Sequence, residues 1–109
     1  MGSERLRVTL YWQAQQPLDT SYVIFAQLLG PVGEVRSQVD VVPRDGGYPT
    51  TWWLPGEVVA DSFLLQLPED VPPGTTLRLI AGLYDPITGA RLPVLHTGGN
   101  YVDLGGVQP

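Results

Sequence analysis

The sequence predicts an all-β domain, a two-sheet antiparallel β-sandwich of about seven to eight strands resembling immunoglobulin or jelly-roll architectures. Thirteen Gly and eleven Pro divide the 109-residue chain at intervals typical of turns. Between these breaks, apolar and polar residues alternate with a period of two, and no longer stretch keeps a helical period. A closed β-barrel is the alternative that this pattern leaves open.

Three strands are predicted in the first half of the chain. Residues 6–12 alternate, so that one face of the strand is apolar and the other polar. Residues 22–29 form a more continuous apolar run, rich in β-branched and aromatic residues, which suits a central strand. Residues 34–42 alternate again and predict the third strand.

Two further strands follow, each with one irregular residue. In residues 58–67 the acidic Asp61 falls on the apolar face, which predicts a β-bulge or a local hydrogen bond. Residues 68–74 contain too much proline to extend a strand or a helix. Residues 75–84 alternate, and Gly82 within them predicts the close approach of a large side chain, for which a Trp ring is a candidate. Tyr84 is a candidate for a buried, hydrogen-bonded tyrosine.

Residues 85–89, with the sequence DPITG, predict a hairpin turn. Asp85 caps the turn, proline presets φ, and Gly89 is expected to have a positive φ. The chain would then return as a strand over residues 91–95 and end with a last strand over residues 101–104.

We expect one domain over residues 1–109, since the length suffices for a single modest core. Residues 1–3 resemble an expression remnant, and residues 105–109 are expected to form a flexible tail. The alternating pattern predicts a core that includes Val8, Leu10, Trp12, Ile24, Phe25, Phe63, Leu65, Leu79 and Ala81.

Composition excludes several classes of function. The net charge is −5, and all six basic residues are Arg scattered along the chain, whereas a nucleic-acid partner needs clustered cations. No apolar run approaches the roughly 18 residues of a membrane helix, so direct membrane insertion is not expected. The chain has no Cys, which removes disulfides, thiol catalysis and thiolate metal sites.

The titratable residues do not predict an enzyme. His96, the single His, stands at the end of a short apolar segment and is interpreted as a surface residue without a partner. No Ser has the context of a nucleophile elbow. Asp61 with Glu57, or Asp45 with Asp85, are conceivable carboxylate pairs, but eleven acidic residues produce such pairs by chance.

Calcium is the metal best suited to a chain rich in carboxylates and free of thiolates. However, the chain has no D-x-D-x-D-G series, and turn chemistry accounts for Asp45 before Gly46-Gly47 and for Asp85 before Pro86. We therefore expect no metal and no cofactor.

Residues 46–57, with the sequence GGYPTTWWLPGE, place two tryptophans side by side. Pro49 and Pro55 are expected to keep this segment out of a helix, and consecutive residues of an extended chain point to opposite sides. Trp53, which leads directly into a strand, is therefore assigned to the core, and Trp52 to the surface.

Trp52 then forms a candidate binding site with its neighbours Tyr48, Arg44, Asp45 and Thr51. An exposed Trp ring is a typical contact for a sugar or for a protein partner. The alternative is that Trp52 lies flat over Gly46 and Gly47 and binds nothing.

Several segments resemble a recurring bacterial module. The most specific are W-x-P-G-E at residues 53–57 and G-L-Y-D-P-x-T-G at residues 82–89, and the similarity covers residues 6–104. The module is a β-sandwich domain appended to multi-pass membrane glycosyltransferase-like proteins of the oligosaccharyl- and mannosyltransferase type. The resemblance implies an extracytoplasmic location and no particular activity. Trp52 departs from the module, which is typically polar there, so a role for Trp52 would be particular to this chain.

Two functions are consistent with these observations. The first is a non-catalytic extracytoplasmic accessory domain of a bacterial membrane or cell-surface protein, which contacts its own polypeptide or a partner subunit. The second is a carbohydrate-binding module that uses Trp52 and the neighbouring loop residues. The fold alone does not choose between them.

Overall fold

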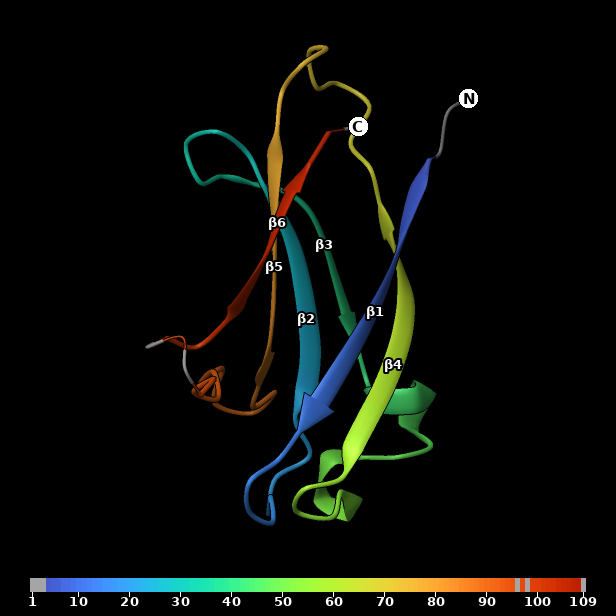
Figure 1. Cartoon of the computed structure of the whole chain (residues 1–109), viewed down its shortest axis with the longest axis vertical. Coiled ribbons are helices and arrows are strands. Elements are labelled where there is room, and N and C mark those ends of the chain that lie inside the picture. Colours follow the sequence, from blue (N-terminus) through green and yellow to red (C-terminus); the bar gives the residue numbers. More distant parts are fainter. Residues whose placement is uncertain (1–3, 96, 98, 109) are drawn as a thin grey trace.

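The computed structural model describes residues 4–95, 97 and 99–108, and their strands form two antiparallel sheets packed face to face (Figure 1). Strands β1 (Arg5–Gln13) and β4 (Val58–Gln66) form a two-stranded sheet. The other sheet has the order β3-β2-β5-β6, built from Val35–Val41, Val23–Leu29, Leu77–Tyr84 and Val102–Val107. The predicted two-sheet, all-β class is confirmed, with six strands among the described residues in place of seven or eight.

The strand order is compatible with part of the order in an immunoglobulin-type sandwich. The pair β1-β4 corresponds to strands B and E, and β3-β2-β5-β6 to C′, C, F and G. The outer strands A and D of that fold have no counterpart among the described residues. The two-stranded sheet is therefore narrow. No helix in the described part of the chain is both long enough and apolar enough to cross a membrane.

The core lies between the sheets, on the residues that the alternating pattern selects. It consists of every second residue of β1, β2, β4 and β5, with Trp53 added from the loop: Val8, Leu10, Ile24, Ala26, Leu28, Trp53, Val59, Phe63, Leu65, Leu77, Leu79, Ala81 and Leu83. Trp12, predicted as core, is only partly buried against this cluster, and its Nε1 is buried without a hydrogen-bond partner among the described residues.

Phe25 is buried, as predicted, but outside the main core. Its neighbours Ile24 and Ala26 point between the sheets, so its own ring lies on the outer face of the four-stranded sheet. There the Arg91 guanidinium sits 4.3 Å from the ring centroid. Gly82 is the cross-strand partner of Phe25, and a Cβ on Gly82 would come within 2.7 Å of Phe25 Cε2. The large neighbour of Gly82 is thus Phe25 and not a Trp.

Asp61 is accommodated on the apolar face of β4 by a hydrogen bond, and the strand has no bulge there. The β1-β4 register is continuous past Asp61, which pairs with Leu10. The Asp61 side chain is 8% exposed and accepts a hydrogen bond from the Arg44 backbone N–H at 3.1 Å. Of the two predicted explanations, the local hydrogen bond is therefore confirmed. A buried carboxylate requires such a donor.

The turn after β5 is built as predicted. Gly89 has φ +78°, and its N–H donates to the Asp85 carbonyl. The Asp85 carboxylate accepts the Ile87 N–H at 2.8 Å. Tyr84, before this turn, is partly buried and donates its hydroxyl to the Asp40 carboxylate.

The chain after this turn differs from the prediction. Residues 91–95 form only isolated bridges, at Arg91 and at Val94, because Pro93 has no N–H to donate to a ladder. The last strand instead extends to Val107, so part of the expected tail is paired with β5. Gly105, with φ +103°, takes up the register shift in this pairing.

Two short 3₁₀ turns lie between β3 and β4: η1 (Pro43–Gly46) and η2 (Thr50–Trp52). As expected, the segment forms no α-helix, but one 3₁₀ turn, η2, follows Pro49. Pro49 stands at the N-cap of η2 with φ −60°, where its fixed φ suits a helical start and its missing N–H is not required.

Candidate functional site

The segment between β3 and β4, residues 42–57, lies beside the two-stranded sheet and is called the Trp52 corner below (Figure 1). Thr50 anchors it: this residue is fully buried, donates its hydroxyl to the Thr20 carbonyl at 2.6 Å, and accepts the Tyr22 N–H at 2.9 Å. Trp53 is the second anchor, since it lies in the core and donates Nε1–H to the Tyr48 carbonyl at 2.9 Å. Both anchors tie the corner to the body of the domain.

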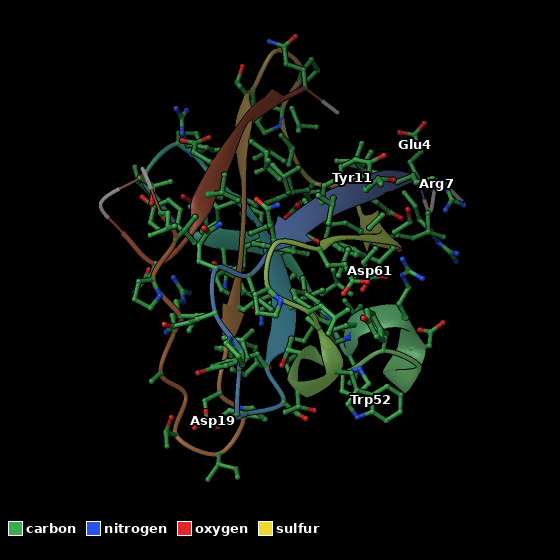
Figure 2. All side chains as sticks on the ribbon, turned by 60° about the horizontal axis from the view of Figure 1, so that its bottom comes forward. Glu4, Arg7, Tyr11, Asp19, Trp52 and Asp61 are labelled. Carbon is green, nitrogen blue, oxygen red and sulfur yellow. The ribbon has the colours of Figure 1, made fainter. Side chains whose placement is uncertain are left out.

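The two tryptophans have opposite environments, as predicted. Trp53 is 4% exposed, whereas Trp52 is 61% exposed and projects outward at the corner (Figure 2). The cause is the change of backbone between them: Trp52 is the last residue of the η2 turn, and Trp53 is extended with φ −67° and ψ 134°. A Cβ placed on Gly46 or Gly47 would meet no atom of Trp52 within 4 Å.

Tyr48 supports Trp52 from the side. The two ring centroids are 6.5 Å apart in an edge-to-face arrangement. The Tyr48 hydroxyl donates to Glu57 Oε1 at 2.6 Å, and the same carboxylate oxygen accepts the Leu54 N–H at 3.0 Å. These contacts close the loop between Tyr48 and Glu57 around the exposed indole.

Glu57 and Tyr48 shift each other's titration. The hydrogen bond from Tyr48, followed by that from the Leu54 N–H, lowers the pKa of the Glu57 carboxyl below its usual value. The same bond to Glu57 is the main cause that raises the pKa of the Tyr48 hydroxyl. Glu57 was not predicted as a site residue, although its place in the W-x-P-G-E segment, three residues after Leu54, is a signal for such a turn contact.

Arg44, by contrast, is bound to the sheet. Its Nε donates to the Ala60 carbonyl at 2.5 Å, while its backbone N–H holds Asp61. Arg44 and Asp45 both adopt left-handed backbone, with φ 53° and 54°. Such backbone is uncommon for residues other than glycine, and the bonds from Arg44 to β4 hold it in place.

The five predicted site residues are therefore only partly brought together. Tyr48 and Trp52 are in contact, and Arg44 serves the structure. Asp45 and Thr51 are exposed, and their side chains form no hydrogen bond within the part of the chain that the structure describes.

Exposed apolar side chains continue from this corner onto the outward face of the two-stranded sheet. Leu54 in the loop is 65% exposed and Val58, the first residue of β4, is 61% exposed. Tyr11 of β1, cross-strand from Ala60 and diagonal to Val58, is 70% exposed. The corner thus combines an exposed indole with further apolar surface.

The remaining chemical candidates do not assemble into a site. The carboxylates of Glu57 and Asp61 bind different partners, Tyr48 and the Arg44 backbone. Across residues 4–95, 97 and 99–108, no three His, Cys, Asp or Glu side chains gather where a metal ion could bind. His96 lies outside the described residues.

Comparison with protein-family models, curated proteins and solved structures finds no match to this chain.

Proposed function

We propose that this chain is a non-catalytic interaction domain whose main contact residue is Trp52. Following the resemblance of its sequence segments, we place it outside the cytoplasmic membrane of a bacterium, as an accessory unit of a membrane or cell-surface protein. Its partner would be its own polypeptide or a neighbouring subunit. The observation that carries the proposal is a Trp side chain 61% exposed on an anchored corner.

An exposed Trp whose backbone is held in place can contribute strongly to the free energy of binding. Trp is enriched among the few residues that dominate protein interfaces, because its large ring removes much apolar surface from water. Binding costs less when the contact residue is already held in place. Thr50, Trp53 and the Tyr48–Glu57 bond hold the backbone on both sides of Trp52.

The surrounding polar groups favour a protein partner over a sugar. A glycan site needs free hydrogen-bonding groups beside the aromatic ring, to pair with sugar hydroxyls. Here the Tyr48 hydroxyl and the Glu57 carboxylate are bonded to each other, and the Arg44 Nε is bonded to Ala60. The apolar neighbours Leu54 and Val58 extend the surface in a way that suits a protein.

Glycan binding remains the second candidate. It is supported by the exposed face of Trp52 together with the exposed Asp45 and Thr51. In this alternative, these two residues supply the polar contacts that the rest of the corner does not offer.

The two functions can be separated with the domain and its Trp52→Ala variant. The immobilised domain is incubated with solubilised bacterial envelope and, in parallel, run in affinity gels that contain single polysaccharides. We expect a discrete envelope protein to be retained by the wild type and lost with Trp52→Ala, without retardation by any polysaccharide. Ile87→Ala, at a residue 91% exposed in the turn after β5, is the matched control and should behave as the wild type.

Two results would overturn the proposal. Retention that is equal for the wild type and Trp52→Ala would remove Trp52 from the contact. Saturable retardation by one polysaccharide, abolished by Trp52→Ala, would replace the interaction function with the glycan function.

A further inference from the structure

We propose that β1 pairs edge to edge with β1 of a second copy of this chain, in antiparallel orientation. The two-stranded sheets of both molecules would then form one continuous sheet. This inference concerns the edge of β1, which shares only Tyr11 with the exposed apolar residues described beside the Trp52 corner, and it does not rest on the function proposed above.

The first observation is the direction of the β1 backbone groups. The Leu67 N–H donates to the Glu4 carbonyl in the same register that pairs β1 with β4. Because antiparallel hydrogen-bonded pairs alternate, even-numbered residues of β1 bond to β4. The N–H and C=O groups of the odd-numbered residues point away from β4: Arg5, Arg7, Thr9, Tyr11 and Gln13. Within the described residues, β1 has no strand partner other than β4 to receive them.

The second observation is that the free edge of β4 is covered. The same alternation directs the even-numbered residues of β4 outward, and two of their carbonyls carry side-chain donors. Arg44 Nε donates to the Ala60 carbonyl, and Ser37 Oγ of β3 donates to the Gln66 carbonyl. The segment before β4 and the strand β3 thus close this side of the two-stranded sheet.

The edge of β6 is also modified. Its pairing with β5 shifts register between Leu79 and Ile80, and Gly105 has φ +103° at this position. Such a bulge twists an edge strand and discourages further pairing. β1 has none of these protections: its register is continuous over Arg5–Gln13, it contains no Pro, and no charged residue points inward.

The third observation is that β1 is complementary to itself. An antiparallel pairing centred on Thr9 engages all the outward-directed backbone groups of both strands. On the solvent face it opposes Arg7 to Tyr11 of the second copy, and Arg5 to Gln13, so that no like charges meet. Arg opposite an aromatic ring adds a cation–π contact. On the inner face, Val8 meets Leu10 and every pair is apolar.

This self-complementarity favours a second copy over an unrelated strand. A register centred on Arg7 would oppose the two Arg7 guanidinium groups, so the charges also select among registers. Arg7 and Tyr11 lie on β1 with exposed side chains and are free to make the contact (Figure 2).

The test exchanges the charges across the proposed interface. Sedimentation equilibrium over about 10 µM to 1 mM covers the range of a small edge-to-edge contact. We expect the wild type to dimerise. Tyr11→Lys sets a lysine against Arg7 at two symmetric positions and should raise the dissociation constant about tenfold or more. Tyr11→Phe, which keeps the ring, should dimerise as the wild type does.

The double variant Arg7→Glu/Tyr11→Lys should restore the dimer, because the introduced glutamate faces the introduced lysine of the other molecule. Within one molecule, these positions are roughly 13 Å apart along the strand, so an internal ion pair does not explain such a rescue. Backbone amide exchange supplies an independent measurement: the amides of Arg7, Thr9 and Tyr11 should become protected as concentration rises.

The proposal fails if the wild type stays monomeric throughout this range. A monomer would also be the result if the natural partner of the β1 edge were a different protein, and that outcome overturns the proposal equally. It also fails if Tyr11→Lys dimerises as tightly as the wild type, or if the double variant does not recover. All three variants change exposed side chains on the outward face, and a thermal unfolding curve checks that each is folded.

Discussion

At the scale of single residues, neighbours in sequence perform different tasks in this domain. Trp52 and Trp53 are adjacent, yet one side chain faces solvent and the other fills the core. The backbone changes from a 3₁₀ turn at Trp52 to an extended conformation at Trp53, and this change directs the Trp53 indole inward. There its N–H donates to the Tyr48 carbonyl. Burial of that N–H without a partner would be costly, and the bond explains why the core tolerates a Trp at this position.

Alanine substitutions should therefore separate the two residues. Trp53→Ala removes a buried indole and leaves the Tyr48 carbonyl without its donor, so we expect it to lower the free energy of unfolding by about 3–5 kcal/mol. Trp52→Ala should change this free energy by no more than about 0.5 kcal/mol, because the side chain is exposed. Urea unfolding of both variants measures the difference. Equal destabilisation would show that Trp52 also serves as packing.

At the scale of elements, the turns of this fold depend on a few backbone conformations. The turn after β5 closes through the Asp85 carbonyl and carboxylate, and it requires a left-handed residue at Gly89. A Cβ at Gly89 would meet no other atom within 4 Å. The demand for glycine here is thus one of backbone conformation and not of space.

Gly89→Val should accordingly lower the free energy of unfolding by roughly 1–2 kcal/mol, since a β-branched residue resists positive φ. Gly99→Val is a matched control, because a side chain at Gly99 also meets open space and its φ lies outside the left-handed range. Chemical denaturation of the two variants compares them directly. If Gly89→Val were as stable as the control, the positive φ would not be required by the turn.

At the scale of the whole molecule, the acidic chain stabilises individual carboxylates through local donors. The pKa of Glu57 is lowered by the Tyr48 hydroxyl and the Leu54 N–H, and that of Asp103 by the Gly105 N–H and then by Arg78. A carboxyl whose pKa is lower in the folded state contributes stability above its unfolded pKa of about 4. This contribution is lost as pH falls through the folded value.

Stability should therefore decline between about pH 5 and the lowered pKa values, and Tyr48→Phe should make the decline shallower. Without the hydroxyl, the pKa of Glu57 moves back toward its usual value, and the folded and unfolded states then bind protons more alike. Urea unfolding at a series of pH values measures the slope. Tyr101→Phe is the control, and an unchanged slope in Tyr48→Phe would contradict the role of the Tyr48–Glu57 bond.

At alkaline pH, Tyr48 and Tyr84 should make stability fall as pH rises, the opposite of the effect of the carboxylates at acidic pH. Their pKa values are raised, by the bond to Glu57 for Tyr48 and by burial, followed by the bond to Asp40, for Tyr84. Their contribution to stability is therefore present below about pH 10 and is lost as pH rises through the folded values.

The fold class, most strand positions and the Gly89 turn could be predicted from the sequence, and the assignment of Trp53 to the core and Trp52 to the surface was a prediction that the structure confirms. These features depend on local rules, namely the period of two, turn residues with special φ, and the proximity of Trp53 to a strand. Interaction and location, which rest on resemblance and surface chemistry, stay predictions.

Which side chains contact each other across the sheets could not be predicted from the sequence. Alternation shows that Phe25 and Ile24 face opposite ways, but only the sheet pairing places Phe25 over Gly82 and under Arg91. Likewise, the sequence predicted Arg44 as a binding residue, but in the folded chain its Nε donates to the Ala60 carbonyl of β4. Local propensity acts over a few residues, whereas these contacts join segments distant along the chain and form only when both sheets have packed.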